Sequence, residues 1–291
     1  MSEPRAGSSR PWSELRARLA AAGFRPSRAL GQNFLLDANL ARAIARDARV
    51  GAGDLVVEVG PGCGALSREL GALGVRLVAF EIDRRLAEFA REALAPYPQA
   101  EVVRADVLAG KHALAPEVLE RLPAHSDWHV VANLPYSAGT PFLALAARLE
   151  HPPRSMTVLL QRELAERLAA QPGSKAWGPV GAKLALAYDV ELLRRVAPAL
   201  FWPQPKVESA VARFHLKADR PDGSAMAAYD RLVDALFQAR RKTLLSRLSD
   251  RLGNRAAARA HLEALGLDPT ARPEVLGVEQ LLALARAVGP P

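Results

Sequence analysis

The chain has 291 residues, 49% hydrophobic and 24% charged, which excludes a disordered protein and allows one large domain with a smaller one, or two domains. The formal net charge of +8 makes a polyanion, most commonly nucleic acid, the expected partner. A single cysteine, Cys63, excludes an intrachain disulfide and a cysteine-based zinc site, and it fits a reducing cytoplasm.

The first half of the chain predicts strands and helices in alternation. After a helix over 13–22, a loop at 31–35 and a helix that Asp37 caps, apolar runs predict strands at 55–59, 76–80, 101–104, 128–132 and 155–160. Helices are expected between them at 65–73, 84–94 and 140–149. This alternation predicts a parallel sheet with helices on both faces, and it places ligands at the carboxyl ends of the strands.

The second half has a different pattern. Residues 184–193 and 207–216 predict two more strands, and 219–224 form a turn-rich linker. From Met226 onward the apolar spacing is helical. We therefore expect a separate small helical domain at the C-terminal end of the chain.

Membrane, secretory and metal-binding classes are not favoured. The longest uncharged stretch, Trp128 to Ala147, contains two prolines and does not predict a membrane span. The first eleven residues have no apolar run, so we expect no secretory signal. The six histidines lack ligand spacing, and we expect no bound metal.

A glycine-rich turn follows the predicted strand at 55–59. Its G-x-G-x-G spacing and lack of basic residues disfavour a pyrophosphate, whereas the nearby carboxylate of Glu58 suits a cationic ligand such as S-adenosylmethionine. Glu81, at the next strand end, is expected to accept from ribose hydroxyls, and Asp106, at the third, from an adenine amine. The alternatives are a solvated strand-end acid for Glu81, a turn cap for Asp106, and a packing role for Cys63.

The tetrad Asn133-Leu134-Pro135-Tyr136 follows a fourth predicted strand. The Asn133 amide and the Leu134 carbonyl can both accept from an exocyclic NH2, and Pro135 favours an extended Leu134. Tyr136 offers a ring on which a base can stack. The tetrad therefore predicts a site that presents a planar amine to an electrophile. The alternative is a polar loop between a strand and a helix.

Basic residues cluster between positions 231 and 259. On a single helix Arg240, Arg247 and Arg251 would share a face, with Arg241 and Lys242 beside it. Such a stripe predicts contact with RNA phosphates, and affinity that falls with added salt. The alternative is an ordinary solvated helix face.

Taken together, these motifs resemble the ribosomal RNA adenine N6-dimethyltransferase family. The resemblance covers about residues 28 to 250, and it rests on the segments Gly31–Leu35, Glu58–Gly64, Glu81–Asp83, Asp106, Asn133–Tyr136, Gln161–Glu163 with Arg167 and Leu168, Phe201–Val211 and Phe237–Leu244. It implies a Rossmann-like class I S-adenosylmethionine-dependent methyltransferase fold with a small C-terminal helical domain. The corresponding division is an N-terminal extension at 1–27, a methyltransferase domain at 28–218 and a helical RNA-binding domain at 219–291.

The resemblance also implies site residues. The catalytic set would be the tetrad with Phe201 as a second stacking ring, although Phe201 could equally be a core residue. The S-adenosylmethionine contacts would be Gln32, Asn33, Leu35, Glu58, Gly60, Gly62, Glu81, Ile82, Asp106, Val107 and Asn133.

The implied reaction is dimethylation of adenine N6 in ribosomal RNA. Residues 240–244 are similar to the KsgA-type branch, which modifies two adjacent adenines in the 3′-terminal hairpin of small-subunit (16S) rRNA. The expected partner is then the immature 30S subunit, and we expect a monomer. Two alternatives stay open: an Erm-type enzyme that modifies large-subunit (23S) rRNA and confers macrolide resistance, and a ribosome-assembly factor with secondary methylation.

Overall fold

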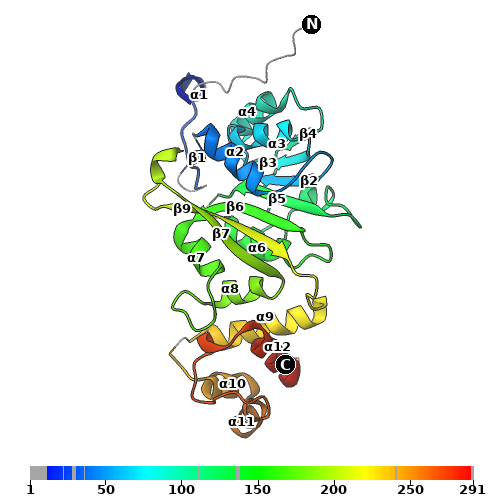
Figure 1. Ribbon diagram of the computed structural model, residues 1–291, viewed down its shortest axis with the longest axis vertical. Helices are drawn as coiled ribbons and strands as arrows, with labels where there is room; N and C mark the ends of the chain where they lie inside the picture. The colour runs from blue at the N-terminus through cyan, green and yellow to red at the C-terminus, as the bar shows by residue number, and fades with distance from the viewer. Residues whose placement is uncertain are drawn as a thin grey trace.

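The computed structural model describes residues 12–21, 23–27, 31–35, 37–110, 112–135, 138–239 and 241–289 (Figure 1). The predicted roles of Tyr136 and Arg240 lie outside the described residues. None of the described helices is both long enough and apolar enough to cross a membrane.

A seven-stranded sheet forms the centre of the molecule, in the order β4-β3-β2-β5-β6-β9-β7 (Figure 1). Neighbours from β4 to β6 are parallel, whereas β9 is antiparallel to both β6 and β7. The prediction of a parallel sheet, made for the alternating first half of the chain, is confirmed for five strands, and the two strands of the second half, for which no direction was predicted, add an antiparallel edge. The bounds are β2 Leu55–Val59, β3 Arg76–Phe80, β4 Ala100–Val103, β5 Trp128–Asn133, β6 Ser155–Gln161, β7 Tyr188–Val196 and β9 Ser209–Leu216.

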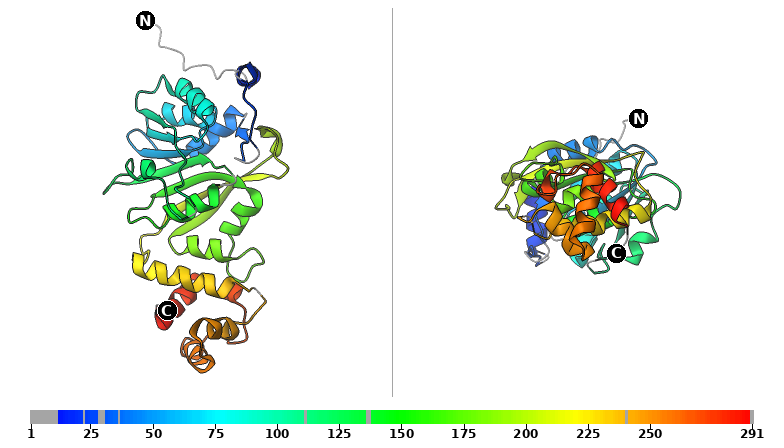
Figure 2. Two further views of the ribbon diagram at one scale, coloured as in Figure 1. Left: turned by 180° about the vertical axis from the view of Figure 1, so that it is seen from behind. Right: turned by 90° about the horizontal axis from the view of Figure 1, so that it is seen from below.

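Alternate residues of the central strands face two hydrophobic layers, because side chains along a strand point to opposite faces. Val57 and Val130 belong to one buried cluster, with residues of α6 and α8. Val56 and Val131 belong to another, with residues of α2 and α3. Helices cover both faces, as predicted (Figure 2). Their bounds are α2 Ala38–Asp47, α3 Ala65–Ala72, α4 Arg84–Leu94, α5 Pro116–Leu119, α6 Gly139–Ala146, α7 Arg162–Leu168 and α8 Pro179–Ala185.

The strands of the second half differ from the prediction at their starts. Leu184 lies in α8, and β7 begins only at Tyr188. An apolar run of this length is compatible with a buried helix as well as a strand, so periodicity alone could not place the boundary. A separate two-stranded sheet was not predicted. In it β1 (Phe34–Leu35) pairs with β8 (Phe201–Trp202), next to the 3-10 helix η1 (Pro198–Leu200).

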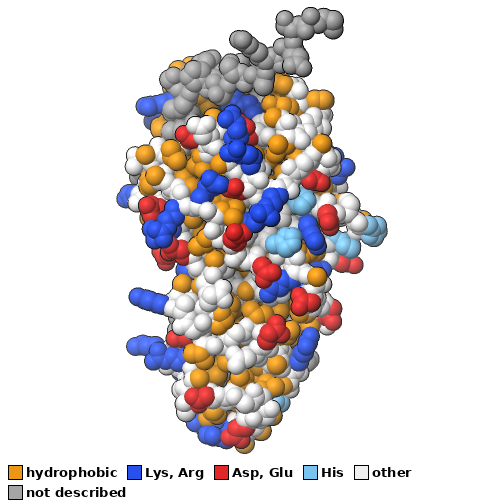
Figure 3. Space-filling view, viewed as in Figure 1, with side chains coloured by type: hydrophobic (Ala, Val, Ile, Leu, Met, Phe, Trp, Pro, Cys, Tyr) orange, Lys and Arg blue, Asp and Glu red, His pale blue; other side chains and the backbone are white. Residues whose placement is uncertain are grey.

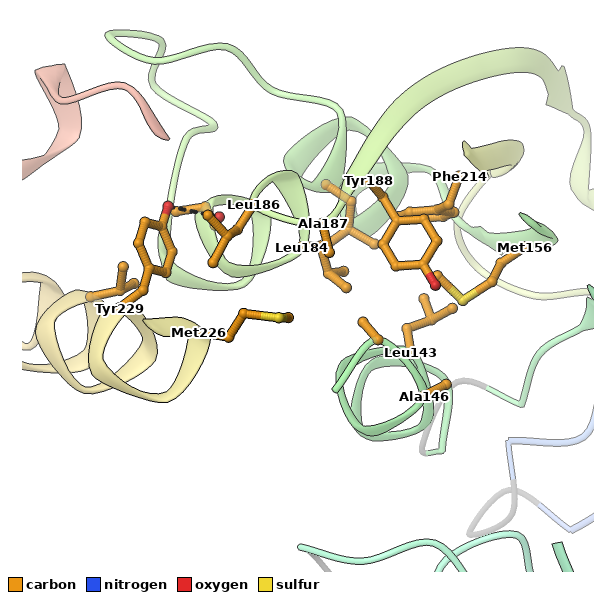
Figure 4. Close-up of a cluster of buried hydrophobic side chains, with 14 of the residues drawn as sticks. Leu143, Ala146, Met156, Leu184, Leu186, Ala187, Tyr188, Phe214, Met226 and Tyr229 are labelled. Atoms are coloured by element: carbon orange, nitrogen blue, oxygen red, sulfur yellow. Dashed lines mark hydrogen bonds between the residues drawn. The ribbon is translucent and has the colours of Figure 1, made fainter. Parts of the chain in front are cut away.

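Four helices follow β9: α9 Gly223–Phe237, α10 Leu244–Leu252, α11 Arg255–Ala264 and α12 Val278–Val288, with the 3-10 helix η2 (Pro273–Val275) before the last. Their core is continuous with that of the sheet. Figure 4 shows Met226 and Tyr229 of α9 beside Leu184 and Leu186 of the α8 region, in a cluster that also includes Phe214 of β9. The division at 218/219 stays a prediction, but the buried side chains do not stop there.

Candidate active site

The main cleft lies at the carboxyl ends of β2, β3 and β5. It is bounded by the segment 31–35, the glycine-rich turn at 60–64, Glu81 and the first residues of the tetrad. Eleven of the predicted site residues line it: Gln32, Asn33, Leu35, Glu58, Gly60, Gly62, Glu81, Ile82, Asn133, Leu134 and Pro135.

The glycine-rich turn is in contact with the other walls of the cleft. Gly60 has a φ of 68°, and a Cβ there would lie 3.0 Å from Pro135 Cγ. Gly62 has a φ of 56°, and a Cβ there would lie 3.0 Å from Phe34 Cδ1. Both positions combine a left-handed backbone with close packing, so a side chain at either would be strained and crowded. The turn thus brings backbone against the tetrad on one side and the 31–35 segment on the other.

Glu81 is buried and holds the turn. Its two carboxylate oxygens accept from the backbone N–H groups of Gly62 and Asp83, each at 3.0 Å. Burial raises the pKa of Glu81 to about 7, and the backbone hydrogen bonds oppose that rise. Each oxygen retains a further lone pair. The predicted role as acceptor for ribose hydroxyls is therefore compatible with the contacts that Glu81 already makes.

Glu58 lies beneath the turn, at 1% exposure. Burial, with a contribution from the charge of Glu81, raises the pKa of Glu58 to about 8. Its Oε2 atom has no hydrogen-bond partner among the described residues. With a pKa of about 8 the Glu58 carboxyl is mostly protonated near neutral pH, and a cation that approached it would favour the ionised form. The Oε2 atom can accept from a donor of a ligand in the cleft.

Asn133 ends β5 and is fixed by the segment on the opposite wall. Its Nδ2 donates to the backbone carbonyl of Asn33 at 3.0 Å. That contact occupies the donor side of the amide and leaves Oδ1 as an acceptor. Leu134 is buried, and its N–H donates to the Leu159 carbonyl at 3.2 Å. The two acceptors that the tetrad was predicted to offer, Asn133 Oδ1 and the Leu134 carbonyl, thus come from consecutive residues at the cleft wall.

A second hollow adjoins the main cleft and contains Asp106 and Val107. Gly60, Glu81, Ile82 and Pro135 line both spaces. Ile82 is 48% exposed, so its apolar side chain is accessible to a ligand in either space. Asp106 Oδ1 accepts from the Leu108 N–H at 2.9 Å, so Asp106 acts as a turn cap, and its second oxygen takes no part in that bond.

Phe201 does not line either space. Its ring is 3% exposed and packs in the cluster of Leu35, Leu40 and Ile44. Its backbone lies opposite Leu35 in the two-stranded sheet. The predicted stacking on a substrate ring is therefore wrong for this structure, because the side chain is committed to the core behind the 31–35 segment.

The predicted basic stripe is also not formed. Helix α9 ends at Phe237 and α10 begins at Leu244 with Thr243 as its cap, so Arg241 and Lys242 do not belong to the helix that contains Arg247 and Arg251. Arg247 is 9% exposed; its guanidinium donates to the Ala235 carbonyl, Gln238 Oε1 and Asp250 Oδ2. Arg251 is half-buried, and its Nη2 donates to the Gly289 carbonyl at 3.4 Å.

Arg241 and Lys242 are the members of the predicted set that the structure leaves exposed. Lys242 Nζ lies 3.5 Å from Asp250 Oδ2, on the surface. On the face in Figure 3, basic and acidic side chains are interspersed over the sheet and the helices, without one continuous basic field. Among the described residues, no group of three metal-ligating side chains is gathered.

The sequence interpretation missed residues that build the cleft. Phe34 and Leu86 line it, and neither belongs to the predicted site. Phe34 stacks on Trp202 with ring centroids 5.9 Å apart. The large apolar residues at 34–35 and 201–202 were a local signal for short strands. That these two segments pair with each other, more than 160 residues apart, has no local signature.

Comparisons with known proteins agree on one family. Residues 23–287 match the family described as ribosomal RNA adenine dimethylase. A ribosomal RNA small subunit methyltransferase A of Phenylobacterium zucineum is 40% identical over 273 residues, covering 94% of this chain and 92% of the relative. The protein of that name from Geobacillus kaustophilus is 38% identical over 276 residues, covering 92% of each.

Two solved structures are similar. The crystal structure of the 23S rRNA methyltransferase ErmE has a TM-score of 0.66 at 28% identity, covering 87% of this chain and 98% of that chain. A dimethyladenosine transferase from Plasmodium falciparum has a TM-score of 0.71 at 20% identity, covering 85% and 94%. The second likeness concerns the fold alone.

Proposed function

The chain belongs to the ribosomal RNA adenine dimethylase family, and from this premise we propose that it dimethylates N6 of two adjacent adenines in the 3′-terminal hairpin of small-subunit rRNA. The fold is the predicted Rossmann-like class I methyltransferase fold. The observation that carries the proposal is the Asn133 amide, whose Nδ2 is bound by Asn33 and whose Oδ1 is left to accept.

The main cleft fits S-adenosylmethionine by the chemistry of its walls. The Glu58 carboxyl suits a positively charged ligand, because a nearby cation would favour its ionised form, and Glu81 suits a ribose. When bound there, S-adenosylmethionine supplies a sulfonium methyl group to a nucleophile. We infer that Gln32, Asn33, Leu35, Gly60, Gly62 and Ile82 enclose it together with these carboxyls, and that Asp106 and Val107 in the second hollow hold an adenine ring.

Asn133 and Leu134 act on the substrate amine. The lone pair of adenine N6 is delocalised into the ring, so the free amine is a weak nucleophile. Two acceptors that draw its N–H bonds out of the ring plane localise that lone pair. Their fixed positions also orient the nitrogen, so this chain supplies geometry and an electrostatic field. The N6 proton leaves after transfer, and no dedicated general base is required.

The RNA side of the proposal rests on Arg241 and Lys242, which are exposed at the break between α9 and α10. Stacking of the extruded adenine on Tyr136 stays a prediction. The partner would be the immature 30S subunit. This protein would then act in the cytoplasm, where ribosomes are assembled. A monomeric state also stays a prediction.

The Erm-type alternative retains support from the likeness to ErmE. The names of the curated relatives favour the small subunit instead. Both branches would use the same cleft, so the cleft itself does not separate them.

A methyl-transfer assay tests the proposal. The protein is incubated with radiolabelled S-adenosylmethionine and with unmethylated small subunits, unmethylated large subunits, or 16S rRNA alone. We expect label in small-subunit RNA, recovered as N6,N6-dimethyladenosine. Label confined to the large subunit would establish the Erm-type activity instead, and no label in any RNA would overturn the proposed function.

A further inference from the structure

Helix α1 (Trp12–Ala21) lies against the back of the main cleft. It precedes the residues that match the family, which begin at 23. Leu19 is fully buried and belongs to a cluster with Phe24, Phe34, Cys63 and Leu86. Phe34, Cys63 and Leu86 also line the cleft. The helix therefore forms the layer directly behind one cleft wall, although none of its described side chains, at 15–21, lines the cleft.

A short turn connects α1 to that wall. Gly23 adopts a φ of 66°, and the Phe24 N–H donates to the Leu19 carbonyl at 2.9 Å. The reversal places the Phe24 ring edge-on to Phe34, with centroids 5.7 Å apart. Phe34 in turn packs against Gly62, where no Cβ could be added without crowding. A continuous line of packed groups thus runs from Leu19 to the glycine-rich turn.

Helix α1 is tethered to α4 and to β8 by polar contacts. Arg18 forms an ion pair with Glu92 and lies over the Phe89 ring, 5.2 Å from its centroid. Arg85 Nη1 donates to the Gly23 carbonyl at 2.7 Å. On the other side, Arg16 lies 5.8 Å from the centroid of Trp202, the ring on which Phe34 stacks. Phe34 therefore lies between two rings that α1 contacts: Phe24, which packs with Leu19, and Trp202, over which Arg16 lies.

We propose that α1 is a positioning element for the cofactor cleft. Leu19, acting through Phe24 and Phe34, holds the 31–35 segment against the glycine-rich turn and thereby sets the affinity for S-adenosylmethionine. The same segment carries the Asn33 carbonyl that orients Asn133. This inference rests on the proposed function, since it concerns the ligand of that same cleft. Leu19, Phe24 and Arg18 are positioning residues and do not touch substrate.

The test compares Leu19→Ala with Leu19→Met and Ala17→Ser in the full chain. Leu19→Met nearly conserves volume and should restore packing. Ala17 is exposed on the same helix, so Ala17→Ser serves as the surface control. Binding of S-adenosylmethionine is measured by calorimetry, and kcat is measured at saturating S-adenosylmethionine. We expect Leu19→Ala to weaken binding by about tenfold, as lost pre-organisation does, and to lower kcat as well, because the loosened segment carries the Asn33 carbonyl that orients Asn133. Both controls should bind within about twofold of wild type.

Hydrogen exchange supplies a readout that a purely stabilising role would not give. In Leu19→Ala, amides at 31–35 and 60–64 should exchange faster, while those of β2 and β3 are unchanged. If Leu19→Ala does not fold, Arg18→Ala removes a tether without leaving a cavity, and the same local pattern is expected. Wild-type affinity in a folded Leu19→Ala or Arg18→Ala protein, or faster exchange throughout the sheet, would overturn the inference. Absence of binding by the wild-type protein would instead overturn the proposed function.

Discussion

One hydrogen bond determines which atom of Asn133 faces a substrate. Because Nδ2 donates to the Asn33 carbonyl, Oδ1 is the free side of the amide. We predict that Asn133→Ala lowers the single-turnover methyl-transfer rate by about 100-fold or more, the usual loss when a fixed hydrogen-bonding group is removed from an active site. RNA affinity, measured by filter binding, should change by less than about threefold. Near-normal turnover would contradict the role given to this amide.

Glu58 predicts a pH dependence of stability. Its pKa is raised from 4.5 in the unfolded chain to about 8 in the folded protein, so the folded state binds the extra proton between these values. The contribution of Glu58 to stability is therefore fully present below pH 4.5 and is lost as the pH rises towards 8. Glu81 acts in the same direction, with a folded pKa of about 7.

The change Glu58→Gln should remove the part of this pH dependence that comes from Glu58, because an amide does not ionise, and leave the part that comes from Glu81. We expect the ligand-free variant to be more stable than wild type at pH 8, by about 1–3 kcal/mol, and not at pH 5. Urea unfolding at the two pH values measures the difference. A variant that is destabilised equally at both pH values would show that the carboxyl is needed for packing alone.

At the scale of elements, Arg247 clamps α9 to α10. Three groups accept from its buried guanidinium, including the Ala235 carbonyl near the end of α9. We predict that Arg247→Ala lowers the free energy of unfolding by about 2–4 kcal/mol, since buried acceptors lose a charged donor. Arg247→Lys should not rescue it, because an ammonium cannot reproduce the planar contacts.

Lys242 provides the matched comparison, because it is exposed and makes only a surface ion pair. Lys242→Ala should change stability by less than about 0.5 kcal/mol and should weaken RNA binding with a shallower salt dependence. If Arg247→Ala were as stable as wild type and defective only in RNA binding, Arg247 would not hold α9 to α10. The predicted contact of Arg247 with RNA phosphates would then be favoured.

The local pattern of the sequence was sufficient for the elements that surround the site. Strands β2 and β3 and helix α4 have the predicted bounds, because each is a buried run or an amphipathic face with clear ends. Arg247 was misplaced for a definable reason. The predicted stripe assumed one helix through residues 240–251, whereas the Thr243 cap restarts the helix and changes which face each residue occupies.

At the scale of the whole molecule, the sheet and the C-terminal helices share one core. Tyr229 of α9 donates to the Ala182 carbonyl at 3.0 Å, and Trp177 Nε1 donates to the Leu276 carbonyl at 3.2 Å. Arg148 pairs with Asp230 through two contacts of 2.7 Å. Of these residues, Tyr229 is drawn in Figure 4, beside the apolar cluster that joins α9 to the sheet.

We therefore predict that both parts unfold in one transition. Calorimetry should give a single peak, and Tyr229→Ala should lower its midpoint without splitting it, by several degrees for a loss of about 3–5 kcal/mol. Hydrogen exchange would show amides of β6 and α9 opening with similar free energies. Two separated peaks in the wild-type protein would favour independent domains.

The site as a whole was predictable because parallel strands bring their carboxyl ends together, so motifs far apart in sequence meet at one edge. What the sequence did not reveal is the layer behind the cleft. The β1–β8 pairing and the docking of α1 depend on contacts between distant segments. Phe201 is buried as a result of that pairing, so its burial could not be read from the sequence, and its ring was assigned to the substrate instead.

The wall between the main cleft and the second hollow has a consequence for inhibition. Gly60, Glu81, Ile82 and Pro135 line both spaces, so an inhibitor made of two linked parts, one for each space, would contact these four residues from both sides. Joining two weak fragments in this way replaces the second binding event by an intramolecular one at millimolar effective concentration. Because Gly60 and Pro135 are already in contact, substitutions that enlarge the wall would also distort the enzyme, which restricts simple routes to resistance.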